Sequence, residues 1–257
     1  MSKHKEYIVH NAEEISRIRQ AAQAAALVRE TLPSLVTPGM STKQVDDIAG
    51  RLIADTGGVS AFLGYRGYPG QICISVNDEV VHGIGRDDYI LQENDLVSLD
   101  IGVKLNGGIG DNATTFILGE PDSDVARLLK YTQKALDNAI DKAVKGNFIK
   151  DISSAIARTA KQGGLGVVRE YVGHGCGIAL HEPPEVPNFV SGYKGPRLRP
   201  GMVLAIEPMF NLGSYKVKTD KDRWTVRTRD GKKSAHFEHM VLITNNKPEV
   251  LTWQKMS

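Results

Sequence analysis

The sequence predicts an α+β fold in which two related halves share one sheet, with a site between them. Helix-type segments are followed by short β-type runs, and this order occurs twice along the chain. In each half a glycine lies six residues before an apolar helix position, as Gly39 does with Val45 and Gly146 with Ile152, although so short a repeat can arise by chance. No Pro/Ser-rich linker separates the halves, so we predict a single domain over residues 1–257.

Helices are expected where apolar residues recur every three or four positions between capping signals. Ile15 and Ile18 follow this spacing in the first segment, and Pro33 comes just after its end. Ser41 or Thr42 can cap the second segment, and Gly-Gly pairs close the second and fourth. The expected helices are 12–31, 41–56, 122–145 and 150–162.

Strands are expected in short apolar runs bounded by Gly, Pro and Asn. Asn106-Gly107 is a strong hairpin signal, and a two-residue turn there would place residue 100 opposite residue 113. The stretch SAFLGYRGYPG is expected to form loop and irregular strand. The expected strands are 72–76, 96–103 and 110–118, with further strands inside 167–175, 202–210, 224–229 and 237–244.

Composition and charge are ordinary, with 41% hydrophobic residues, 24% charged residues and a net charge of +2. So small a net charge does not indicate binding to nucleic acids or to membranes. No run of apolar residues approaches the roughly 18 that span a bilayer. Residues 1–10 are polar, lack a signal-peptide pattern and are expected to form an N-terminal extension. Two cysteines, Cys73 and Cys176, make no disulfide framework. We expect a cytoplasmic monomer without membrane contact.

Charged residues inside apolar strands are informative, because an unpaired buried charge is costly. Asp100 and Asp111 fall on the two strands of the expected hairpin and on one face, diagonal to each other or directly opposite if the turn shifts by one residue. Two carboxylates this close raise each other's pKa unless a cation lies between them. They indicate a metal site, against the alternative of a solvated edge with two unrelated aspartates.

Three more candidates stand in similar surroundings: His174 between glycines in YVGHGCG, Glu207 in VLAIEPMF, and Glu238 in AHFEHMVLIT. Each of them alone could be a structural residue. With the two aspartates they form an oxygen-rich set with one imidazole, which suits a pair of divalent ions such as Mn, Fe, Co or Zn. The other histidines are a candidate pair, His82 and His181, and four with no predicted role, His4, His10, His236 and His239.

These motifs resemble type I methionine aminopeptidase, a family with the pita-bread (creatinase-like) fold. LDIG, GD, YVGHGCG, HEPP, AIEPMF and FEHMVLIT carry the resemblance, which extends from about residue 11 to about residue 252. It implies a pseudo-twofold antiparallel sheet with helices on the outer face. It also implies an aminopeptidase that removes the N-terminal methionine of nascent proteins when the second residue is small, by attack of a metal-bridging hydroxide on the scissile carbonyl.

The resemblance implies a role for each candidate ligand. Asp111 and Glu238 would bridge two metal ions, whereas Asp100 would hold one of them. His174 and Glu207 would complete the other ion. Glu207 would also act as a general base.

The same resemblance assigns the remaining candidates to the substrate. His181 would stabilise the oxyanion at the scissile carbonyl, and His82 would lie near the scissile amide and help proton transfer. Phe62 and Leu180 replace a Cys and a Phe that are common in the family, and ordinary core packing is the alternative role for both. The methionine pocket would be lined by Tyr65, Tyr68, Cys73, Trp224, Phe62 and Leu180.

Segment lengths favour the short bacterial-type enzyme, since the chain has no room for the helical subdomain of type II enzymes and no large N-terminal domain of the prolidase kind. There are two alternatives. One is an X-Pro aminopeptidase with the same ligands, and the other is a catalytically dead homologue that only binds proteins or RNA. Residues 216–233 hold eight Lys or Arg and three Asp. They predict either a solvated hairpin or a contact with ribosomal RNA.

Overall fold

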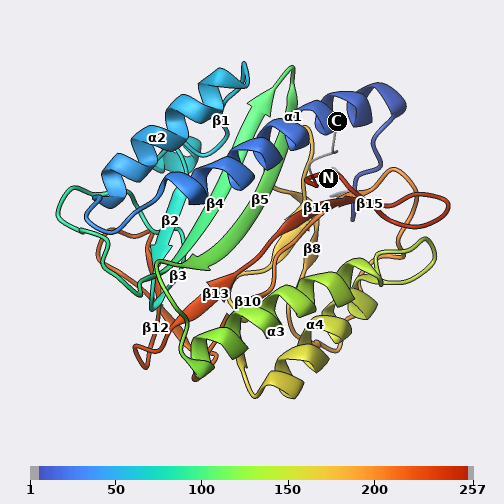
Figure 1. Ribbon diagram of the computed structural model, residues 1–257. Helices are drawn as coiled ribbons and strands as arrows, with labels where there is room; N and C mark the ends of the chain where they lie inside the picture. Colours follow the sequence, from blue (N-terminus) through green and yellow to red (C-terminus); the bar gives the residue numbers. More distant parts are fainter. Residues whose placement is uncertain (1–5, 254–257) are drawn as a thin grey trace.

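The helices form two pairs that lie over a curved set of strands, one pair over each half of the molecule (Figure 1). The structure is a computed structural model and describes residues 6–253. The helices are α1 (Ala12–Thr31), α2 (Thr42–Asp55), α3 (Ser123–Ile140) and α4 (Ile149–Gly163), with short 3-10 helices at Leu32–Leu35 and Tyr65–Gly67.

Reciprocal caps explain where the first two helices begin. The Asn11 side chain accepts a hydrogen bond from the Glu14 backbone, and the Glu14 carboxylate accepts one from the Asn11 backbone. Ser41 and Gln44 make the same pair of bonds at the start of α2. The predicted helices 12–31 and 41–56 are therefore confirmed to within a residue.

The third predicted helix was too long, because α3 ends at Ile140 rather than at residue 145. Backbone bonds from Lys142 to Ala139 and from Ala143 to Ile140 tighten the chain after this point. The tighter turn buries Ala143 completely. Apolar spacing alone cannot reveal this change, since a buried alanine suits both conformations.

The strands are short except for one long antiparallel hairpin. Its strands, β4 and β5, pair along ten residues each, and β4 also pairs with β1 and β2. A second sheet has the order β15-β14-β9-β7-β8, and two three-stranded sheets are β13-β10-β6 and β11-β12-β3. The bounds are β1 Val59–Ser60, β2 Cys73–Val76, β3 Glu79–Val81, β4 Leu96–Leu105, β5 Gly108–Ile117, β6 Gly166–Val167, β7 Gly173–Gly175, β8 Glu182–Val186, β9 Val203–Ile206, β10 Met209–Asn211, β11 Val217–Thr219, β12 Val226–Thr228, β13 Ser234–His236, β14 His239–Leu242 and β15 Glu249–Val250.

The hairpin register follows the sequence prediction. Asp100 pairs with Ala113, and Asp111 pairs with Gly102, two positions along. Asn106 and Gly107 form the turn, both with positive φ (51° and 79°), as a type I′ turn requires. The diagonal arrangement of the two aspartates is therefore confirmed.

Glycines let α1 pack closely over the hairpin. A Cβ on Gly110 would lie 2.2 Å from the carbonyl oxygen of Ala21, and one on Gly108 would lie 2.5 Å from that of Arg17. The alanine-rich face of α1 lies against these positions and is fully buried at Ala21 and Ala22. The close contact fixes the back of the strands that carry Asp111.

Part of the expected N-terminal extension packs onto the fold; residues 1–5, including His4, lie outside the described residues. His10 is 5% exposed and its backbone donates to the Gly201 carbonyl. Its Nε2 lies 2.9 Å from the Glu182 carboxylate, which also accepts bonds from the Ile178 and Ala179 backbones. His10 had no predicted role, yet through Glu182 this histidine holds the turn that precedes His181.

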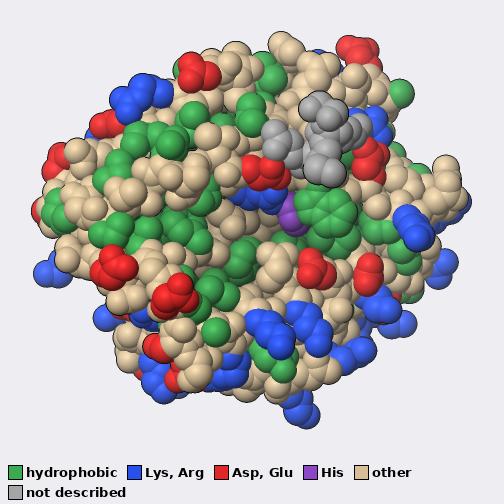
Figure 2. All heavy atoms as spheres, viewed as in Figure 1, with side chains coloured by type: hydrophobic (Ala, Val, Ile, Leu, Met, Phe, Trp, Pro, Cys, Tyr) green, Lys and Arg blue, Asp and Glu red, His purple; other side chains and the backbone are tan. Residues whose placement is uncertain are grey.

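Within residues 6–253, none of the helices has the length and hydrophobicity that crossing a bilayer demands. The face in Figure 2 carries charges of both signs, and Lys and Arg side chains gather over its lower part, where α3 and α4 lie. This pattern agrees with the small net charge of the chain.

Candidate metal centre and active site

A cavity of about 370 Å³ is lined by strands and loops of both halves. All the side chains that the sequence analysis assigns to metal, catalysis or methionine line it, together with five others. Its lining is Phe62, Tyr65, Arg66, Tyr68, Cys73, His82, Asp100, Asp111, Glu170, Tyr171, Val172, His174, Leu180, His181, Glu207, Glu185, Trp224 and Glu238.

Three acids converge around one small residue of the hairpin. Ala113 pairs with Asp100 on one side and with Glu238 on the other, and Asp111 lies two positions before it on β5. Paired residues and residues two apart share a face of a sheet, so the three carboxylates point to the same side.

A second small residue, Ala205, organises the other half of the site. It pairs with His174 of β7 and with Met240 of β14. Glu207 follows Ala205 by two positions, in the break between β9 and β10 that Pro208 marks. Glu238 precedes Met240 by two positions, so it belongs to both groups.

Glu238 was predicted within a strand over residues 237–244, whereas β14 begins only at His239. Residues 237–238 interrupt the strand between β13 and β14. At this break the Glu238 backbone exchanges hydrogen bonds with Ala113 instead. The switch of partner turns the carboxylate toward the hairpin, which a uniform apolar run does not reveal.

The resulting cluster has the dimensions of a metal site. Ligand atoms of Asp111, His174 and Glu238 all lie within 4.8 Å of one another. His174 Nε2 is 3.5 Å from Glu207 Oε1 and 3.9 Å from Asp111 Oδ2. Asp111 and Glu238 are only 4% and 2% exposed, so solvent screens their charges poorly.

Burial is the main cause that raises the pKa of all four carboxyl groups, Asp100, Asp111, Glu207 and Glu238. Repulsion among them raises each pKa further, from Glu207 at Asp100, from Asp100 at Asp111, and from Asp111 at both glutamates. Burial, and then the nearby His181, lowers the pKa of His174 to about 3, so its imidazole is neutral at neutral pH. A cation would relieve the repulsion and bind the neutral imidazole.

Buried polar atoms that lack a hydrogen bond indicate whether the cluster suits such a cation. Among the described residues, the buried side-chain atoms without a hydrogen bond include Asp100 Oδ1, Asp111 Oδ1 and Glu238 Oε1. Buried carboxylate oxygens are normally satisfied. Three such oxygens in one cavity, with carboxylate and imidazole donors, fit divalent metal.

Two further histidines face the same cavity. His181 Nδ1 lies 2.8 Å from the Tyr65 hydroxyl, and its ring centroid is 4.3 Å from that of His174. His82 follows β3 with φ of 60°, and its ring meets the edge of Tyr171. Burial lowers the pKa of both, to about 4 for His82, where the nearby His181 is the second cause. Both imidazoles are therefore neutral at neutral pH.

Next to the acids the cavity is apolar. Tyr68 and Trp224 meet edge to face at 5.1 Å, and the Tyr68 hydroxyl donates to the Ile72 and Gly83 carbonyls. Cys73 pairs with Asp100 in the sheet, which joins the apolar part to the acids. Phe62, Tyr68, Cys73 and Leu180 are each less than 9% exposed. The space suits an apolar side chain beside the acid cluster.

One further site residue, His236, was not predicted from the sequence. Its Nε2 has no hydrogen bond and lies 3.4 Å from Glu207 Oε2 and 3.9 Å from Glu238 Oε2. Burial, and next His82, lowers its pKa to about 3. His236 lies two positions before Glu238, and this spacing was the available signal. The sequence interpretation took His236 and His239 as neighbours of Glu238 rather than as ligands.

Comparison with known proteins gives one consistent result. The chain matches metallopeptidase family M24 over residues 16–245. Methionine aminopeptidase 1 of Bacillus subtilis is 47% identical over 239 residues, which cover 93% of this chain and 96% of that protein. The crystal structure of methionine aminopeptidase from Thermotoga maritima has a TM-score of 0.93 at 38% identity and covers 96% of this chain and 99% of its own.

A more distant likeness concerns the fold alone. Prolidase from Pyrococcus furiosus has a TM-score of 0.78 at 23% identity, over 97% of this chain and 66% of that one. Together with the Thermotoga maritima structure it confirms the predicted pita-bread fold.

Proposed function

The chain belongs to metallopeptidase family M24, among its methionine aminopeptidases, and from this premise we propose which residues remove the N-terminal methionine and how. The observation that carries the proposal is the convergence of four carboxylates and one imidazole, with three unpartnered oxygens, beside an apolar pocket. The proposed substrates are nascent polypeptides with a small second residue, the proposed place of action is the cytoplasm, and the whole chain acts as one catalytic domain and as a monomer.

We propose that two divalent metal ions bind at Asp100, Asp111, His174, Glu207 and Glu238. When bound, such ions polarise a carbonyl and lower the pKa of a coordinated water. Co, Mn, Fe and Zn all suit this set of donors, because carboxylates and imidazole accept each of them.

The chain's own residues position the substrate around this centre. His181, held by Tyr65, faces the place of the scissile carbonyl and donates a hydrogen bond as negative charge develops on its oxygen. His82 lines the same pocket, where it can pass a proton to the leaving amine. Glu207, whose carboxylate lies 3.5 Å from His174 at the edge of the acid cluster, takes the proton from the attacking water as general base.

The apolar walls select methionine. Tyr68, Trp224 and Cys73 form a close-packed end of the pocket, and Phe62 and Leu180 add bulk without polar atoms. An unbranched thioether fills such a pocket and contacts aromatic edges well.

Substrate comparison tests this proposal. With Mn or Co under anaerobic conditions, the protein should release methionine from Met-Ala-Ser, and at least about 100 times more slowly from Met-Leu-Ser, because the second residue lies against the acid cluster. Amino-acid analysis measures the product. Ala-Pro-Ala is the control substrate, and its cleavage in preference to Met-Ala-Ser would favour an X-Pro aminopeptidase instead.

We also propose that the basic hairpin of residues 216–233 contacts ribosomal RNA. Lys216, Lys218 and Lys221 are exposed on and beside β11. Replacing all three by Glu should weaken ribosome co-sedimentation at least about tenfold, because phosphate contacts dominate such binding. The control reverses the charge of Lys130 and Lys134, which are exposed on α3. Unchanged co-sedimentation of the hairpin variant would rule out this contact.

A further inference from the structure

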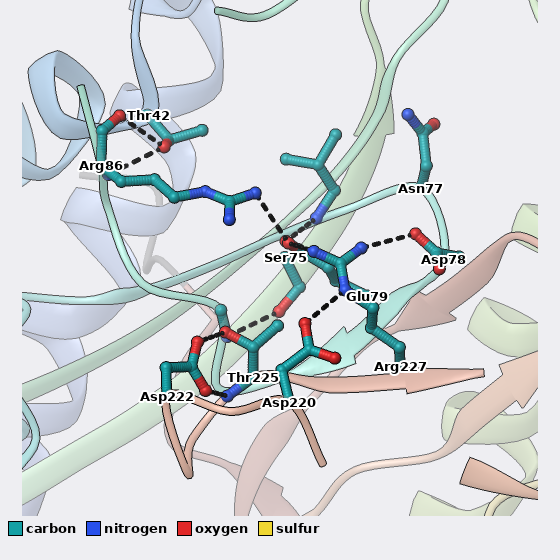
Figure 3. A network of polar contacts seen from close by, with 12 residues as sticks. Thr42, Ser75, Asn77, Asp78, Glu79, Arg86, Asp220, Asp222, Thr225 and Arg227 are labelled. Carbon is teal, nitrogen blue, oxygen red and sulfur yellow. Dashed lines mark hydrogen bonds and ion pairs between the residues drawn. The ribbon is translucent and has the colours of Figure 1, made fainter. Parts of the chain in front are cut away.

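One arginine of the basic hairpin turns inward instead of facing solvent. The guanidinium of Arg227 donates from Nε to Asp220, from Nη1 to Asp78 and from Nη2 to Glu79, at 2.6, 2.7 and 2.6 Å (Figure 3). These three acids come from two separate segments: Asp78 and Glu79 lie at the start of β3, and Asp220 follows β11. A planar fork can bridge three carboxylates in this way, whereas a lysine ammonium offers no such fixed geometry.

Glu79 uses both of its oxygens in the same network. Oε1 accepts hydrogen bonds from Arg227 and, at 3.3 Å, from Arg86, while Oε2 accepts one from the Val76 backbone at 2.8 Å (Figure 3). The side chain is buried, with an exposure of 4%. Glu79 therefore ties the end of β2 and the start of β3 to β12.

Both strands joined by this network lead directly into the cavity. β3 pairs with β12 through Val81 with Val226 and through Glu79 with Arg227. His82 is the next residue after β3, and Trp224 stands two residues before Val226. Asp222 fixes the turn before β12 by accepting bonds from the Trp224 and Thr225 backbones at 2.8 and 2.9 Å.

The backbone of His82 needs such support. Its φ of 60° lies in the left-handed region, which is unfavourable for a residue with a side chain. Conformations of this kind persist only where the surroundings over-determine them. The next residue is held too, because the Gly83 amide donates to Ser75 and its carbonyl accepts bonds from Ile74 and Tyr68.

We propose that Glu79 and Arg227 form a clamp that positions His82 and Trp224 next to each other in the wall of the methionine pocket. The clamp sets the separation of the two rings, which meet edge to face at 6.4 Å. The inference rests on the proposed function insofar as His82 is a catalytic residue; Glu79 and Arg227 themselves are positioning residues. It also reassigns Arg227, since an arginine paired with three carboxylates contributes no free charge to the basic hairpin.

Glu79→Gln tests the clamp in a Trp253→Phe background, where Trp224 is the sole tryptophan. The amide keeps the shape and an acceptor for Val76 but removes the charge that holds Arg227. We expect kcat on Met-Ala-Ser to fall about tenfold, with KM changed less than about threefold, because a shift of His82 well under 1 Å already slows proton transfer. The Trp224 emission maximum should move to longer wavelength and acrylamide quenching should increase.

Arg229→Lys is the matched control, because Arg229 lies on the same hairpin and donates to the Val217 carbonyl outside the clamp. It should leave kcat and emission unchanged. Wild-type kcat in Glu79→Gln, or a lower kcat with unchanged Trp224 emission, would overturn the clamp. If Glu79→Gln does not fold, Asp220→Asn is used instead, because it weakens the bond to Arg227 Nε. The same two measurements, kcat and Trp224 emission, are then compared. A wild-type protein that releases no methionine would contradict the proposed function, and the emission would still report on the clamp.

Discussion

Asp111→Asn is expected to abolish methionine release and, at the same time, to stabilise the metal-free protein. Asp111 lies at the centre of the acid cluster, and its charge raises the pKa of Glu207 and of Glu238. An amide oxygen is a poor bridging ligand, so activity on Met-Ala-Ser should fall at least about 10³-fold, or about 4 kcal/mol in the activation barrier. Titration calorimetry should show weaker Mn binding.

The gain in stability follows from the same electrostatics. Without metal, the buried carboxylates repel one another, and removing one charge relieves this repulsion. A relief of about 1 kcal/mol would raise the Tm in EDTA by about 2–4 °C for a chain of this size. Asp124→Asn, on the exposed first turn of α3, is the control; it should leave activity unchanged and should not raise the Tm, because Asp124 pairs with Arg127. A variant of Asp111 with wild-type activity would show that this carboxylate is not a ligand.

The sequence predicts the positions of the acids in the cluster only where those positions depend on neighbouring residues in the chain. Asn106 and Gly107 set the turn, the turn sets the register, and the register places Asp100 and Asp111 on one face. Each step depends on residues close together in the chain. Residues that depend on distant pairing, such as Glu238 with Ala113, cannot be placed in this way.

The contacts that support the site could not be predicted from the sequence, because they too join residues far apart in the chain. His10 and Glu182 are 172 positions apart, and Arg227 and Glu79 are 148 apart. Nothing in the polar setting of His10 or in the basic stretch around Arg227 reveals a buried acid as partner. No role was predicted for His10, and a solvated hairpin or an RNA contact was predicted around Arg227, whereas tertiary pairing turned both side chains inward.

Removing metal with a chelator is expected to stop activity and to lower the Tm by an amount that grows with pH. The sign follows from the four carboxyl groups of the cluster, whose pKa values are raised in the folded state. A raised folded-state pKa stabilises the metal-free fold at a pH below the unfolded value of about 4, and this contribution is lost as pH rises through the folded value. Metal binding must displace those protons, so it stabilises more as pH rises.

The buried histidines affect the stability of the metal-free protein in the opposite direction, but only at acidic pH. Burial lowers the pKa of His174 and of His236 to about 3 in the folded state, so their contribution is complete above about 6.5 and is lost as pH falls toward 3. Between pH 5.5 and 8 the carboxylates should therefore dominate the difference between metal-bound and metal-free protein.

Differential scanning fluorimetry with Mn or with EDTA across this pH range measures that difference. Mn at a fixed concentration, about 100 times its Kd at pH 8, should stabilise the protein there by about 2.7 kcal/mol, which corresponds to about 5–11 °C in Tm. The gain should shrink toward pH 5.5, and Asp111→Asn should show little gain at any pH. A metal-dependent gain that stays constant or increases toward acid would mean that the metal binds outside this cluster, because a site made of protonated carboxyls cannot hold it.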